Sequence, residues 1–295
     1  MGICLYCNIF TLSGTATANK YVDMFLIWFC FLIKNGQLTE KDKLVMLIDA
    51  PSLNYVNNST IFQYMAPKFQ GKIIVWQVPA PQNILEGMMT RFRFLELIPA
   101  SELKYSDIDT DAQMVYMYSD IDNLFVGPVN SIIPYIELSA KKTNLMVLTE
   151  GTLVHTNYWG GILTTDDEQW VSHNAFLAES PGFSSSLFAF TLKNQSSKEA
   201  IESLFLNVRQ NAKITLFPPQ YTVDQPFYND ALVTYMYKKK EEGIEIFPFD
   251  SSLVKVNTFF TSCPKDTVIL TFCGEPGNEN AHWEKLFTQL FFSFL

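Results

Sequence analysis

The stretch MVYMYSDIDNLFVGPVN, from Met114 to Asn130, organises this chain. Apolar and β-favouring residues occupy positions 114–118, which is typical of a buried strand. Asp120 and Asp122 follow at positions i and i+2, and residues two apart on extended backbone point to the same side. Ile121, between them, is expected to turn into the core. The stretch therefore predicts two carboxylates side by side at the end of a buried strand.

Such a pair suits a hard divalent cation. Mg²⁺ commonly takes one or two carboxylates and fills its other positions with phosphate oxygens and water. Acidic side chains directly after a buried strand are costly unless something compensates their charge. A second acidic cluster, at positions 107, 109 and 111, has no apolar strand before it and is interpreted as a solvated loop. We therefore predict that Asp120 and Asp122 bind Mn²⁺ or Mg²⁺ and, through it, a diphosphate.

The composition narrows the class of protein. The chain has 295 residues, 48% of them hydrophobic, and a formal net charge of -9. That charge argues against nucleic acid as the partner, because phosphate backbones are bound by basic surfaces. The five cysteines are an odd number and mostly lie in apolar segments, so we expect free thiols in a reducing compartment, the cytoplasm.

Neither the N-terminus nor the apolar runs predict a targeting or membrane-spanning segment. The N-terminus lacks the positive region of a secretory signal. The longest apolar run, Met24 to Ile33, is too short to span a bilayer and is expected to form a buried helix. We therefore predict no transmembrane segment.

Strands and helices alternate along the first half. The expected strands are 3–10, 44–48, 72–78 and 114–118, and the expected helices are 22–34, 59–69 and 81–98. This order predicts an α/β fold with a mixed, mostly parallel central sheet flanked by helices. Ligands of such sheets bind beyond the carboxyl ends of the strands. Thr11, Asp49 and Asp120 all fall at such ends.

The second half is less regular but continues the domain. We expect strands at 144–148, 183–190, 244–247 and 267–272, and helices at 197–209, 224–240 and from position 282 onward. No linker interrupts the chain. It is therefore predicted to be a single domain over residues 1–295, with a nucleotide-binding half (1–130) and a half for the acceptor and donor sugar (131–295).

These features, in this order, resemble the nucleotide-sugar-dependent glycosyltransferases of the GT-A fold, particularly glycogenin-like families. The segment Ser119-Asp120-Ile121-Asp122 is similar to their Asp-x-Asp motif, which holds Mn²⁺ or Mg²⁺ against a nucleoside diphosphate. The helix about thirty residues earlier carries Arg91 and Arg93, and in such families a basic residue there often contacts the donor.

Two later segments extend the resemblance over most of the chain. Residues 181–190, which include Ser185, are similar to the strand that closes the donor sugar pocket. Asp224 and Gln225 are similar to an Asp-Gln motif that opens a helix facing donor and acceptor. The resemblance implies a metal-dependent hexosyl or pentosyl transferase of the GT-A-type fold. It would move a sugar from a nucleotide sugar, with UDP favoured over GDP, to a hydroxyl of a glycan, protein or small molecule.

One departure from the family pattern concerns the metal. Many glycogenin-like enzymes take a third metal ligand from a His near the C-terminus, and Thr271 stands where that His would be. His282 is the candidate replacement, with an ordinary helix-surface residue as the alternative.

The remaining roles implied by the resemblance stay open between alternatives. Asp224 acts as base, positions the sugar or simply caps its helix, and Glu150 is a weaker candidate base. Arg91 or Arg93 supplies a second cation, unless Arg93 only pairs with Glu96 on its own helix. From their positions at strand ends alone, Thr11 and Asp49 are expected to contact the base or ribose.

Two other functions compete with the transferase. A haloacid-dehalogenase-like phosphatase also uses Asp-x-Asp and Mg²⁺, but usually after its first strand, whereas three expected strands come before Asp120 here. An inactive, transferase-like protein that binds sugar nucleotides is the second alternative, because the C-terminal motif is altered.

Overall fold

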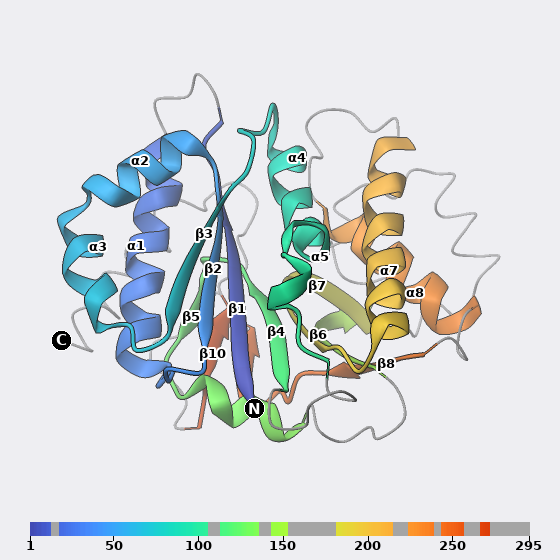
Figure 1. The fold of residues 1–295 in the computed structure, drawn as a ribbon. Helices are drawn as coiled ribbons and strands as arrows, with labels where there is room; N and C mark the ends of the chain where they lie inside the picture. Colours follow the sequence, from blue (N-terminus) through green and yellow to red (C-terminus); the bar gives the residue numbers. More distant parts are fainter. Residues whose placement is uncertain are drawn as a thin grey trace.

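A central sheet dominates the molecule (Figure 1). The computed structural model describes residues 1–12, 18–105, 113–135, 143–152, 181–214, 224–238, 243–256 and 266–271. Within this part, seven strands form one sheet in the order β3-β2-β1-β4-β7-β6-β8. Their bounds are β1 (Gly2–Ile9), β2 (Lys43–Ile48), β3 (Lys72–Gln77), β4 (Met114–Ser119), β6 (Thr143–Thr152), β7 (Pro181–Thr191) and β8 (Ile244–Pro248). A smaller sheet has the order β5-β10-β9, with β5 (Asn123–Phe125), β9 (Val254–Val256) and β10 (Ile269–Thr271).

The large sheet is parallel except at β7. Strand β1 pairs in parallel with β2 and β4, and β2 pairs in parallel with β3. Strand β7 runs antiparallel to both β4 and β6, and β6 is parallel to β8. The prediction of a mixed, mostly parallel sheet flanked by helices is confirmed, and the carboxyl ends of β1, β2 and β4 lie at the same edge.

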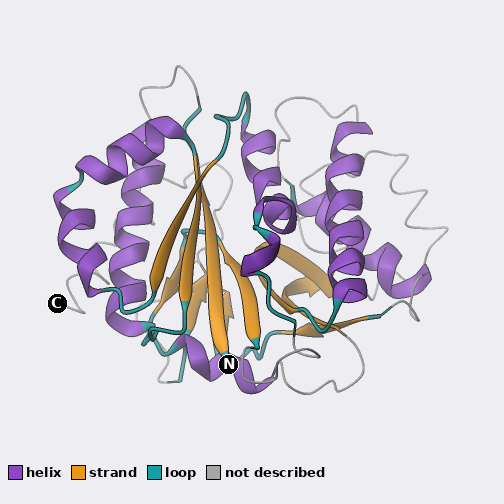
Figure 2. Cartoon of the chain, in the orientation of Figure 1, coloured by secondary structure: helices purple, strands orange, loops and turns teal. Residues whose placement is uncertain are grey.

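Helices cover both faces of the sheet (Figures 1 and 2). One face carries α1 (Ala18–Asn35), α2 (Ala50–Asn58) and α3 (Thr60–Met65), followed by the 3₁₀ turn η1 (Ala66–Lys68). The other carries α4 (Ile84–Met89), η2 (Thr90–Arg93), α5 (Phe94–Leu97), α7 (Gln195–Ile214) and α8 (Gln225–Lys238). Two further 3₁₀ segments are η3 (Ala100–Glu102) and η4 (Val129–Tyr135). No helix in the described part of the chain is long and apolar enough to cross a membrane.

Each face of the sheet has its own hydrophobic core, and β1 contributes to both. Cys4 and Tyr6 lie in the core under α4, α5, α7 and α8, whereas Leu5 and Cys7 lie in the core under α1. Successive side chains of a strand point to opposite faces, so a strand buried on both faces consists of apolar residues throughout. This is why its sequence is a nearly continuous apolar run, broken only by the buried Asn8, rather than an alternating one.

Stacked aromatic rings hold η2 against the sheet. Phe92 of η2 stacks on Phe188 of β7 with ring centroids 5.8 Å apart, and it also packs on Tyr228 of α8 at 5.5 Å. Phe94 stacks on Tyr6 at 3.9 Å. Aromatic pairs in this range contribute about 0.5–1.5 kcal/mol each beyond area burial. The residue before Phe92, Arg91, is thereby fixed at the sheet.

The helices of the structure differ from the predicted ones in two places. The single helix expected over 81–98 is three short segments, because the segment changes to a 3₁₀ turn at Thr90–Arg93. At this break the side chain of Arg91 donates to the carbonyl of Met88, which an uninterrupted α-helix would offer to the backbone of residue 92. Helix α2 was not predicted; Asp49 caps it by accepting from the Ser52 amide at 2.8 Å.

Candidate active site

The acidic pair follows β4 in a turn. Strand β4 ends at Ser119, and the Asn123 amide donates to the carbonyl of Asp120 at 3.2 Å. The extended geometry predicted for Asp120 and Asp122 is therefore wrong, since the chain bends at residues 121 and 122. Ile121 is 1% exposed in the core beneath α1, as predicted. The Asp120 amide donates to the Ser186 carbonyl at 2.8 Å, which ties the turn to β7.

Arg91 connects this turn to two other segments. Its Nη1 lies 3.0 Å from Oδ2 of Asp120 and 2.9 Å from the carbonyl of Ser185. Its Nε lies 3.0 Å from the carbonyl of Met88 and 3.3 Å from Oδ2 of Asp224. The side chain of Arg91 is only 3% exposed. A buried guanidinium needs paired charges and hydrogen bonds, and here it has both.

Asp224, just before α8, is fixed from two sides. Besides Arg91, it accepts a hydrogen bond from the Ser185 hydroxyl at 3.0 Å, and it is 3% exposed. The next residue, Gln225, lies 3.5 Å from the hydroxyl of Ser184 through its Oε1. Four predicted site residues from separate elements, Arg91, Asp120, Ser185 and Asp224, thus form one network.

Burial and neighbouring charges shift the pKa values of Asp120 and Arg91 in opposite directions. Burial raises the pKa of Asp120, while the charge of Arg91 and a hydrogen bond from Tyr118 oppose the rise. Burial alone would lower the pKa of Arg91, but the charges of Asp120 and Asp224 outweigh it and raise that pKa well above its ordinary value. Arg91 is therefore a cation at neutral pH.

Two tyrosines of this network were not predicted. The Tyr118 hydroxyl donates to Oδ1 of Asp120, and Cζ of Arg91 lies 4.7 Å from the centre of the Tyr118 ring. Burial, and next the charge of Asp120, raise the pKa of Tyr21 on α1, which brings that phenol into the same electrostatic environment. Tyr118 had a signal in the sequence: it stands two residues before Asp120, as the alternation of a strand requires for residues on one face.

Thr11 and Asp49 form a second cluster at the carboxyl ends of β1 and β2. Oδ2 of Asp49 accepts from the amide of Thr11 at 2.8 Å and from its hydroxyl at 3.1 Å, and Oδ1 accepts from Ser52. Asp49 is fully buried. These bonds give Asp49 a definite role in holding the loop after β1 to helix α2, and its contact with a nucleotide stays a prediction.

The other predicted residues lie apart from the network or outside the described residues. Arg93 is 41% exposed and pairs with Glu96 at 3.5 Å, which agrees with the alternative that Arg93 only forms an ion pair with Glu96. The Ser119 hydroxyl donates to the carbonyl of Asp120 at 2.9 Å. Glu150 lies within β6. His282 falls outside the described residues.

The donor atoms near Asp122 suit a cation bound by oxygen. Among the described residues no group of three or more His, Cys, Asp and Glu side chains comes together to hold a metal. Oδ1 of Asn123 and Oγ1 of Thr271, however, are buried and have no hydrogen-bond partner. Carboxylate, amide and hydroxyl oxygens fit Mg²⁺ or Mn²⁺.

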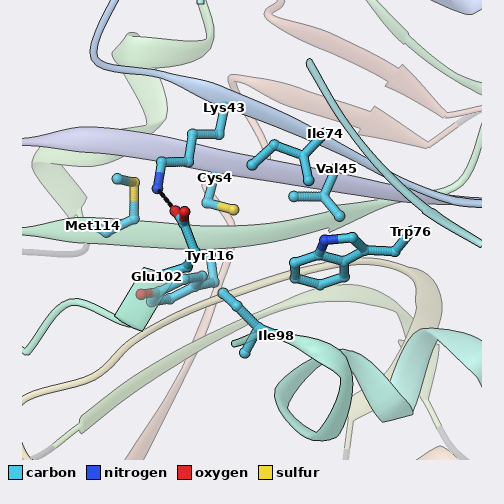
Figure 3. Close-up of a pocket in the computed structure, with 9 residues that line it drawn as sticks. All are labelled: Cys4, Lys43, Val45, Ile74, Trp76, Ile98, Glu102, Met114 and Tyr116. Carbon is cyan, nitrogen blue, oxygen red and sulfur yellow. Dashed lines mark hydrogen bonds and ion pairs between the residues drawn. The ribbon is translucent and has the colours of Figure 1, made fainter. Parts of the chain in front are cut away.

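A small pocket lies at the opposite, amino end of the strands (Figure 3). Its lining is Cys4, Lys43, Val45, Ile74, Trp76, Ile98, Glu102, Met114 and Tyr116. Its volume of about 10 Å³ accommodates about one water molecule. Lys43 and Glu102 form an ion pair within it. The pocket is too small for a nucleotide.

Solved structures similar to this one include glycosyltransferases, whereas no protein-family model and no curated protein sequence matches the chain. The apo form of mouse xyloside xylosyltransferase 1 is similar over 95% of this chain and 99% of its own, with a TM-score of 0.58 and 10% identity. An active-site mutant of LgtC is similar over 99% of this chain and 96% of its own, with a TM-score of 0.50 and 12% identity. The bifunctional glycosyltransferase WbbM has a TM-score of 0.51 and 10% identity, and the match covers 98% of this chain and 51% of that one. By its sheet order, its helical layers and these similarities, the chain has the GT-A fold of glycosyltransferases.

Proposed function

We propose that this protein is a glycosyltransferase that moves a sugar from a nucleoside diphosphate sugar to an acceptor hydroxyl with the help of a divalent cation. One observation carries the proposal. A buried arginine is ion-paired with two aspartates, Asp120 and Asp224, at the carboxyl ends of the strands of a GT-A sheet. Ligands of open α/β sheets bind at this edge.

The chemistry of the transfer requires positive charge beside the leaving diphosphate. As the bond to the anomeric carbon breaks, negative charge develops on the diphosphate, and preorganised cations stabilise it. Arg91 is such a cation, because five contacts fix its side chain before any ligand arrives. Asp122, with Asp120, would hold Mn²⁺ or Mg²⁺, which supplies a further positive charge as a Lewis acid.

Asp224 and Gln225 stand where the sugar and the acceptor would meet in this proposal. Asp224 is oriented by Ser185 and Arg91, so its carboxylate is held in one position. A positioned carboxylate accepts the proton of an acceptor hydroxyl or steadies positive charge on the sugar. UDP sugars are the favoured donors, and the sugar and the acceptor are left to experiment.

The test is a panel of nucleotide sugars with and without Mn²⁺ or Mg²⁺. We expect one donor to raise the melting temperature only when metal is present, and the nucleoside diphosphate to be released slowly by hydrolysis. Asp122→Asn should abolish both effects. Asp23→Asn is the matched control, because Asp23 is an exposed carboxylate on α1 that bonds to Tyr55.

Two results would contradict the proposal. Absence of any nucleotide-dependent shift in the folded wild-type protein would reject nucleotide-sugar binding. Hydrolysis of p-nitrophenyl phosphate that depends on Mg²⁺ and on Asp120, without release of nucleoside diphosphates, would instead indicate a phosphatase.

A further inference from the structure

Strand β3 forms one edge of the large sheet (Figure 1). Among the described residues, no strand pairs with β3 on the side away from β2. The Lys72 amide donates to the Asp42 carbonyl at 3.0 Å, and the Val78 amide donates to the Ile48 carbonyl at 2.9 Å. Because alternate residues of a strand bond to the same neighbour, residues 73, 75 and 77 direct their backbone N–H and C=O groups away from β2.

This edge has few of the features that usually protect an edge strand. Strand β3 is six residues long and pairs with β2 in one continuous register without a bulge. It contains no proline, and its one charged residue, Lys72, stands at the first position. Val75, in the middle, is 42% exposed. Strand β8, at the opposite edge, has Glu245 in its interior and ends at Pro248. Charges, prolines and bulges keep other chains from pairing with an edge, so β3 is open to a further strand.

The spacing of the outward groups suits a second copy of β3. Positions 73, 75 and 77 are symmetric about Val75, so two copies can pair antiparallel about a two-fold axis beside Val75. Position 75 then faces position 75 of the partner, and position 73 faces position 77 on either side of the axis. Each of these facing pairs exchanges two backbone hydrogen bonds. The pairing therefore satisfies every outward N–H and C=O group of the two strands.

The side chains also suit this register. Ile74 comes to lie opposite the partner's Trp76, in a pair without backbone bonds, where side chains lie closer together. Aromatic and β-branched residues form favourable cross-strand pairs. Both side chains are only partly buried within one chain, so they have surface left to cover. Lys72 faces the partner's Val78, so no two like charges of the paired strands face each other.

We propose that the protein forms a homodimer in which two copies of β3 pair antiparallel about Val75 and join the two sheets into one. The inference is independent of the proposed sugar transfer. A two-fold contact uses the same edge of both copies, so assembly stops at two. Because the two copies run antiparallel, the carboxyl ends of their strands, with Arg91, Asp120 and Asp224, lie on opposite sides of the joined sheet.

The experiment measures the mass of the full chain by sedimentation equilibrium. The wild type is expected to have twice the monomer mass of 33.7 kDa at about 100 μM. Val75→Lys and Val75→Glu each bring two like charges face to face at the axis, so each should weaken dimerisation about tenfold or more. An equal mixture of these two variants brings opposite charges together and should restore the dimer.

Leu206→Lys is the matched control. Leu206 is also 42% exposed, but it lies on α7, which packs against α8 and the opposite edge strand β8. The control variant adds the same charge to the chain as Val75→Lys does. It should therefore dimerise like wild type.

Hydrogen exchange tests the same pairing residue by residue. The amides of residues 73, 75 and 77 should exchange slowly in the wild-type dimer and rapidly in Val75→Lys. The amides of Ile74 and Trp76 bond to β2, so they should stay protected in both proteins. This alternation distinguishes the loss of the partner from unfolding of β3.

Three results would overturn the inference. A wild type that is monomeric at about 100 μM would leave the edge of β3 to an extended segment of another protein. A dimer that Val75→Lys leaves intact, or that Leu206→Lys weakens equally, would place the contact elsewhere. A mixture of Val75→Lys and Val75→Glu that stays monomeric would reject the two-fold axis beside Val75.

Discussion

Replacing Arg91 with methionine is expected to lower the free energy of unfolding by about 3–5 kcal/mol. Methionine preserves much of the length and packing of the side chain but leaves Asp120 and Asp224 as buried carboxylates without their cation. The carbonyls of Met88 and Ser185 lose a charged donor as well, which places the loss at the upper end of this range. For a domain of this size, such a loss lowers the melting temperature by about 6–10 °C.

Arg93 provides the matched control. It lies in the same 3₁₀ segment two residues away, but it is 41% exposed and its pair with Glu96 is exposed too. Exposed ion pairs contribute about 0–1 kcal/mol, so Arg93→Met should change stability by less than about 1 kcal/mol. Urea unfolding of wild type and both variants at neutral pH gives the comparison. Equal losses in the two variants would refute the argument that Arg91 is the central charge of the network.

The stability of the Arg91→Met variant is expected to depend on pH. Burial raises the pKa of Asp120, and Arg91 opposes that rise; without Arg91, the folded pKa of Asp120 rises further. A carboxyl group whose pKa is higher in the folded state than its unfolded value of about 3.9 favours the folded state when it is protonated. That stabilisation is present below the unfolded pKa and is lost as pH rises through the folded pKa. The deficit of Arg91→Met relative to wild type should therefore be smaller near about pH 5 than near about pH 7. A deficit that is constant with pH would contradict this explanation.

Two further predictions concern other parts of the fold. Asn229→Ala should lower the free energy of unfolding by about 2–4 kcal/mol. The Asn229 side-chain amide bonds both the N–H and the carbonyl of Phe183 at 2.7 Å, so its removal leaves two buried backbone groups unpaired. Urea unfolding measures the loss, and a loss no larger than that of the exposed Asn58→Ala would argue against this explanation. Burial raises the pKa of the Cys4 thiol to about 12, so at about pH 8 that thiol is protonated and enclosed. Iodoacetamide labelling of the native protein, mapped by mass spectrometry, should therefore modify half-buried Cys30 and spare Cys4, and rapid native labelling of Cys4 would contradict the packing of β1.

The sheet could be predicted from the sequence because its strands are buried on both faces. A run such as residues 3–9 is apolar on both faces apart from Asn8, and Asp49 and Asp120 mark the carboxyl ends of β2 and β4. The same reasoning placed Asp120 at that edge, and the resemblance to GT-A glycosyltransferases added Arg91 and Asp224. Their contacts in the structure agree with that placement.

The parts that sequence reasoning missed depend on tertiary contacts. The break between α4 and η2 accompanies a side-chain bond from Arg91 to Met88, which no helical periodicity encodes. The bend after Ser119 follows from hydrogen bonds to Ser186 on β7, a strand far along the chain. Strands β5 and β10 have three residues each, too few for a periodic pattern, so their pairing was not predictable.

The position of β7 also bears on the order in which the molecule is assembled during synthesis. Strand β4 ends at Ser119, but its neighbour β7 begins only at Pro181. A nascent chain that has emerged as far as β4 therefore carries an open strand edge and an Arg91 that lacks both Ser185 and Asp224. Open edges invite pairing with other chains, so the edge of β4 is exposed to such pairing until β7 is made. The residues of the acidic turn are synthesised early, but the contacts of Arg91 with Ser185 and Asp224 can form only after the later part of the chain is made.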